Sequence, residues 1–185
     1  MANIYQESST KKDSVTLACR FDRTLYELLK KDSREKNISL NSLINSIVKK
    51  YVSWERYAAE IGFIPLSKET VRLILDNLDE EKIRTIGEQL GRTIPRELIL
   101  LMFNRIDFDS ILSFIEITSS RYGRVQHNNG LSYHDFILYH GVSKRFSDFL
   151  AAGLTAMAED LSLKVEVLNA DSKLLSVRIN ESSVG

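Results

Sequence analysis

The sequence predicts an α+β, mostly helical protein that ends in a small antiparallel sheet domain with β-β-α-β-β order. Three observations predict this class. Residues 15–21 alternate apolar side chains with others, as a strand does; apolar residues then recur at helical spacing through the middle of the chain; and pairs of alternating segments flank a helical one near the end. The expected parts are an arm at 1–12, a β-α-α domain at 13–61, a second domain at 62–180 and a tail at 181–185.

The strand predicted at residues 15–21 has no partner nearby in the sequence. Its inward face carries Val15, Leu17, Cys19 and Phe21, and its outward face carries Thr16, Ala18 and Arg20. Helical segments follow at once, so the strand's backbone groups find no neighbouring strand to pair with. The simplest partner is the same strand of a second copy, running antiparallel, which makes a ribbon narrow enough for the DNA major groove. The alternative is an edge strand of a sheet built by the C-terminal part, with Arg20 merely solvated.

Two helices are predicted after this strand. Asp22 is a good N-cap for the first, which should end near Asn37, a residue that tolerates the left-handed conformation. Ser39 then caps the second, whose apolar residues recur at i, i+3, i+4 and i+7 spacing and continue towards Gly62.

This segment resembles the ribbon–helix–helix (MetJ/Arc-type) DNA-binding family over residues 12–53, under a third of the chain. The most specific element is the turn between the helices, which in the family reads small-x-Ser/Thr/Asn-x-Ser/Thr/Asn. Here it stands as Asn37-Ile38-Ser39-Leu40-Asn41, with asparagine where glycine is commonest. Asparagine adopts the required backbone angles, so this departure from the family is mild.

The resemblance implies an obligate homodimer whose ribbon lies in the major groove of double-stranded DNA. It implies base contacts from Thr16, Ala18 and Arg20, with Arg20 the best reader because guanidinium can donate two hydrogen bonds to guanine. Leu17, Cys19 and Phe21 would then form the dimer core. Phosphate contacts are expected from Ser39 and Asn41 at the start of the second helix, and from Lys12 in the arm. The alternatives are that Ser39 is only a helix cap and that Lys12 belongs to a solvated tail.

Charge is divided unevenly along a chain whose net charge is zero. Residues 11–60 carry 11 basic and 7 acidic side chains, a net of +4, whereas residues 61–185 carry 14 and 17, a net of −3. This asymmetry favours nucleic-acid binding at the N-terminal end. The single cysteine excludes an internal disulfide, and no signal peptide or membrane-length apolar run is recognised. We therefore expect a cytoplasmic protein that contacts no membrane.

Short helices are predicted in the first half of the second domain. Their expected starts are Ser67, Asp79, Thr93 with Pro95, and Asp107, and the helix that begins at Asp79 should end at Gly91. Residues 98–103 are apolar on all sides, which predicts full burial, either within the subunit or at a dimer contact.

The sheet domain is predicted from the later alternating segments. A hairpin should turn at Asn128-Asn129-Gly130, a helix should start at Ser143, and two strands should run over 163–167 and 175–179. The helix should cover one face of this sheet. We expect the whole domain to serve oligomerisation or to bind an effector whose identity the sequence does not reveal.

Catalytic and metal-binding patterns are not recognised in this chain. His127 can approach the second hairpin strand, but His134 and His140 should lie about 20 Å apart, because six strand residues separate them. No tight His or Cys spacing accompanies them, so we expect solvated or core histidines and no metal, cofactor or enzymatic activity. The leading expectation is a dimeric, sequence-specific transcriptional regulator in which dimers can pair into tetramers. The alternative is an antitoxin or protein-interaction module whose C-terminal domain binds a partner protein.

Overall fold

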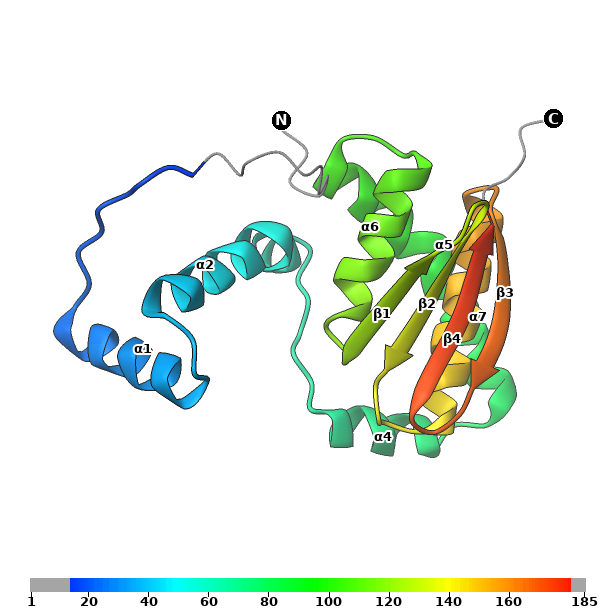
Figure 1. Ribbon diagram of the computed structural model, residues 1–185. Helices are drawn as coiled ribbons and strands as arrows, with labels where there is room; N and C mark the ends of the chain where they lie inside the picture. The colour runs from blue at the N-terminus through cyan, green and yellow to red at the C-terminus, as the bar shows by residue number, and fades with distance from the viewer. Residues whose placement is uncertain (1–13, 181–185) are drawn as a thin grey trace. The chain divides into compact units, whose positions relative to one another are not determined.

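The computed structural model describes residues 14–180, drawn in colour in Figure 1. The predicted arm, Lys12 within it, and the predicted tail lie outside the described residues. The chain divides into two compact units: the N-terminal unit ends at Arg56 and the C-terminal unit begins at Tyr57.

The N-terminal unit consists of helices. They are α1 (Arg23–Glu35), α2 (Leu40–Lys50) and the π-helical turn η1 (Tyr51–Glu55). The short α3 (Arg56–Glu60) begins at Arg56, the last residue of this unit. The helices predicted after Asp22 and Ser39 are confirmed. Residues 14–22 carry no regular secondary structure. The strand predicted at 15–21 is therefore not confirmed in a single chain, where the ladder to a second copy cannot form.

After α3, the C-terminal unit combines four further helices with one sheet. Its elements are α4 (Lys68–Asp76), α5 (Glu80–Phe103), α6 (Phe108–Ser119), β1 (Arg124–Asn129), β2 (Tyr133–Tyr139), α7 (Lys144–Asp160), β3 (Lys164–Ala170) and β4 (Leu174–Asn180). The strands are antiparallel in the order β1-β2-β4-β3, and Figure 1 shows α7 behind the sheet. The predicted β-β-α-β-β domain is confirmed.

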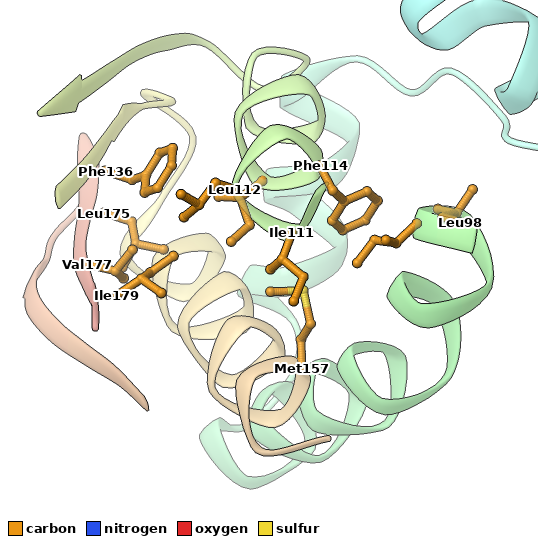
Figure 2. Packing of buried hydrophobic residues seen from close by; sticks show 11 residues of the cluster. Leu98, Ile111, Leu112, Phe114, Phe136, Met157, Leu175, Val177 and Ile179 are labelled. Carbon is orange, nitrogen blue, oxygen red and sulfur yellow. The ribbon is translucent and has the colours of Figure 1, made fainter. Parts of the chain in front are cut away.

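A single apolar core holds the C-terminal unit together. Side chains of the sheet point towards α5, α6 and α7, as Figure 2 shows. The labelled members are Leu98, Ile111, Leu112, Phe114, Phe136, Met157, Leu175, Val177 and Ile179. Each of them is at most 7% exposed, so this unit buries a core of its own.

The helix break predicted between Gly91 and Pro95 is wrong, because α5 runs without interruption from Glu80 to Phe103. Gly91 serves close packing and does not end the helix: a Cβ there would lie 2.1 Å from the carbonyl oxygen of Gly153 in α7. The Thr93 hydroxyl donates to the carbonyl oxygen of Gln89 in the preceding turn and does not cap a new helix. Pro95 is accommodated inside the helix, where packing of the flanking turns outweighs its missing N–H.

Two further predictions about this unit need correction. Full burial of residues 98–103 within one subunit is wrong: Leu98 and Ile99 are buried, but Leu100 and Leu101 are 47% and 38% exposed, because only one side of this long helix meets the core. Their burial at a dimer contact stays a prediction. The hairpin turn is also displaced. Asn129 still belongs to β1 and pairs with His134, so the connecting loop is 130–132.

Candidate nucleic-acid interface

Residues 14–22 present both faces of the predicted ribbon strand to solvent in the single chain. The three predicted base-contacting residues, Thr16, Ala18 and Arg20, are exposed. The three predicted dimer-core residues are exposed as well: Leu17 by 81%, Phe21 by 41%, and Cys19, a free thiol. No contact between these side chains and the rest of the N-terminal unit buries either face.

Asp22 ends this segment and begins α1. Its carboxylate Oδ1 accepts hydrogen bonds from the backbone N–H of Thr24 at 2.8 Å and of Leu25 at 3.2 Å. These bonds satisfy two of the N–H groups that a helix leaves without internal acceptors. The predicted N-cap is confirmed, and it fixes where the extended segment gives way to helix.

The turn between α1 and α2 has the conformation that the sequence predicted for Asn37. This residue has φ 53°, in the left-handed region. The next N–H, of Ile38, donates back to the carbonyl oxygen of Ser33 at 3.0 Å, and the Asn37 N–H donates to Arg34 at 3.0 Å. Such bonds close a helix C-terminus and let the chain reverse at once into the next helix.

The start of α2 is capped by Ser39, whose Oγ accepts from the Ser42 N–H at 3.0 Å. The N–H groups of Leu40 and Asn41 occupy the first two helical positions, where helix geometry provides no internal acceptor and the dipole is positive. An anion is therefore favoured at this end.

Asn45 is a residue that the sequence reasoning missed. Its amide Nδ2 donates to the Asn41 carbonyl at 2.9 Å and approaches the Asn41 side-chain Oδ1 at 3.3 Å. The Asn41 amide oxygen is thereby engaged, which leaves its NH₂ as the end suited to an anion. The signal was present as an Asn-x-x-x-Asn spacing, since residues four apart are neighbours on a helix.

The N-terminal unit buries very little of its apolar surface. Leu43 is the one large apolar side chain in residues 14–56 that is fully buried, at 5% exposure. The exposed apolar side chains of this range are Val15, Leu17, Phe21, Leu25, Tyr26, Leu28, Ile38, Ile47, Val48 and Tyr51. Two short helices with this much exposed apolar surface have no core sufficient to hold them folded alone.

Histidines of the C-terminal unit form two separate arrangements. His127 on β1 and His134 on β2 meet at 2.9 Å between Nε2 and Nδ1, as the sequence suggested for His127. The carboxylate of Glu116 lies 3.6 Å from the other His127 nitrogen. Across residues 14–180, no group of three or more His, Cys, Asp or Glu side chains could hold a metal ion. Asp135 points away from His134 and pairs with Arg178, whose guanidinium holds the pKa of that carboxyl below its usual range.

The third histidine, His140, is buried in a polar network that the sequence did not single out. Its Nδ1 accepts the Val142 N–H at 3.0 Å, so Nε2 carries the proton and donates to the Ser147 Oγ at 2.7 Å. Ser147 in turn donates to the carbonyl oxygen of Asp171 at 2.6 Å. The pKa of His140 is lowered below its usual value. Burial is the main cause and the charge of Lys68 acts in the same direction, whereas the charge of Asp171 opposes them.

No family model matches the chain, and no curated protein matches it either. Within residues 14–180, no helix combines the length and the apolar character needed to cross a bilayer.

Proposed function

We propose that this protein is a dimeric, sequence-specific DNA-binding transcriptional regulator that acts in the cytoplasm. Two copies pair through the N-terminal unit, and residues 15–21 of each form an antiparallel ribbon that enters the major groove. The observation that carries the proposal is the exposed apolar surface of this unit. Within residues 14–56, Leu43 is the one large apolar side chain that is buried. A second copy covers that surface and supplies the missing strand partner.

The polar side chains of the same unit support DNA as the ligand of this dimer. Once the inward face of the ribbon is covered, Thr16, Ala18 and Arg20 remain on the outer face, exposed as they are in the single chain. Arg20 is the residue suited to read guanine. The capped start of α2 offers the N–H groups of Leu40 and Asn41 to a phosphate, which sets position and not sequence preference. The net charge of +4 over residues 11–60 agrees with a polyanionic ligand.

The alternative function, an antitoxin or protein-interaction module, has less support. The tails of antitoxins in the ribbon–helix–helix family are usually short and disorder-prone. The C-terminal unit instead has its own core and a complete four-stranded sheet. It is better suited to an oligomerisation or effector role within the regulator.

The test is selection of bound duplexes from a random DNA pool, with wild type beside Arg20→Ala. Wild type should enrich a roughly palindromic site, and Arg20→Ala should bind that site more weakly by about 1–3 kcal/mol and lose preference at one base pair of each half-site. Arg34→Ala is the matched control, because it removes an equal charge from the last turn of α1, outside the ribbon. Unchanged affinity and preference in Arg20→Ala, or no enrichment by wild type, would contradict the proposal.

A further inference from the structure

The two edges of the sheet in the C-terminal unit differ in their protection against another strand. Strand β3 forms one edge and carries Lys164, Glu166 and a bulge between Val167 and Asn169. Charges and bulges are the usual means of preventing edge-to-edge pairing. Strand β1 forms the other edge, pairs in regular register over all six of its residues, and carries a single charge, Arg124, at its first position.

The hydrogen-bond pattern shows which backbone groups of β1 face outward. The Gly130 N–H donates to the Tyr133 carbonyl at 2.8 Å, which makes that pair a hydrogen-bonded one. Hydrogen-bonded and non-hydrogen-bonded pairs alternate in an antiparallel ladder. The N–H and C=O groups of Val125, His127 and Asn129 therefore point away from β2, and the described chain provides no further strand beyond them.

We propose that β1 pairs antiparallel with β1 of a second copy, so that two C-terminal units share one continuous eight-stranded sheet. The two-fold axis passes between the two His127 residues, with Val125 of each copy opposite Asn129 of the other. This register uses all the outward backbone groups and forms six hydrogen bonds, two for each of three pairs. The pairing is isologous, so the assembly closes at two copies.

The side chains of β1 suit a second copy as the partner. In this register Gln126 lies opposite Asn128 of the other copy, and both are exposed, uncharged amides on the outer face. Arg124 lies opposite Gly130, so no like charges face each other between the two β1 strands. An unrelated peptide strand would have to match the same six outward backbone N–H and C=O groups, whereas a second copy of β1 matches them by two-fold symmetry. The proposal is independent of DNA binding, since it rests on the C-terminal unit alone.

The test measures mass by sedimentation in full-length Phe21→Asp, a background that removes the association expected at the N-terminal unit. This variant should remain a dimer of the 21.2 kDa chain. Adding Gln126→Lys with Asn128→Lys places lysines opposite each other at two positions and should weaken the dimer on the order of tenfold. Leu168→Lys with Asn169→Lys is the matched control, because it adds the same charge to exposed positions on the opposite edge. A monomeric Phe21→Asp protein, or a dimer indifferent to the β1 lysines, would overturn the proposal.

A cross-link tests the register directly. In a Cys19→Ser background, Gln126→Cys with Asn128→Cys should form a disulfide-linked dimer under mild oxidation, because residues directly opposite each other have the right Cβ separation. Each single cysteine should not cross-link, since identical positions are offset by two residues. Absence of the link in the double variant would overturn the pairing, and a link through Gln126→Cys alone would overturn this register.

Discussion

His140→Ala should destabilise the C-terminal unit strongly, because the buried imidazole hydrogen-bonds both the Val142 N–H and the Ser147 hydroxyl. The substitution leaves the Val142 N–H without its acceptor and removes the donor to Ser147, whose side chain is 0% exposed. Each buried polar group left unpaired costs about 1–3 kcal/mol, and the space vacated beside Phe146 adds to this. We expect a total loss of about 3–5 kcal/mol in the free energy of unfolding.

The same network predicts how stability depends on pH. The pKa of His140 in the folded chain is below its ordinary value of 6.5, so the folded state binds fewer protons than the unfolded state between these two values. The stabilisation from the neutral imidazole is therefore fully present above pH 6.5 and is lost as the pH falls through the lower, folded-state pKa. A proton on Nδ1 would face the Val142 N–H and break that hydrogen bond.

Urea unfolding followed by circular dichroism at several values between pH 5 and 8 measures both effects. Wild type should lose stability towards pH 5, and His140→Ala should lose less, since the variant lacks the imidazole whose pKa folding lowers. Ser147→Ala should cost about 1–3 kcal/mol, because it leaves His140 Nε2–H unpaired. Ser172→Ala, in the exposed β3–β4 turn, is the control and should change stability by less than about 0.5 kcal/mol. An identical pH slope in wild type and His140→Ala would refute the reasoning.

Two further predictions separate packing from binding. Gly91→Ala should destabilise the C-terminal unit by about 1–3 kcal/mol or more, since the new Cβ would meet the Gly153 backbone. Thermal unfolding measures this loss. The control, Gln89→Ala on the exposed side of α5, should be nearly neutral. Ser39→Asp should keep the helix cap and the stability but weaken DNA binding on the order of tenfold, because a carboxylate would repel the phosphate expected there. Ser172→Asp adds the same charge in the C-terminal unit and should leave affinity unchanged, and equal affinity of Ser39→Asp would contradict the assignment of that helix end.

Local signals in the sequence predicted the element boundaries wherever a side chain acts on its own backbone. Asp22, Ser39 and Ser143 all cap helices as expected, because such a cap depends on two or three neighbouring residues. Asn37 likewise adopts the left-handed conformation that was expected at the end of α1. These features require no knowledge of distant parts of the chain.

Residues whose role depends on distant contacts were misread. Gly91 looked like a helix end, but the reason for a glycine there lies in Gly153, 62 positions later. Asn128 and Asn129 looked like a turn, yet pairing with β2 holds both in strand β1. The buried role of His140 was equally hidden, since Ser147 and Asp171 reach it from α7 and the β3–β4 turn. At the candidate interface, Asn45 escaped notice because its effect is exerted through Asn41.

The two units bury apolar surface in different ways, and this decides how variants in each should behave. The C-terminal unit packs eleven buried residues of one chain into one cluster, so its folding does not require a second copy, and the pairing proposed at β1 adds to a stability that the single chain already has. The N-terminal unit leaves Leu17, Phe21 and Ile47 exposed, so in our proposal its folding is coupled to association and its stability rises with concentration. A variant such as Phe21→Asp should therefore act by weakening the association of the N-terminal units, and its effect should depend on concentration. A variant such as Ser147→Ala should act equally at every concentration, and this contrast separates association from folding without any knowledge of the DNA site.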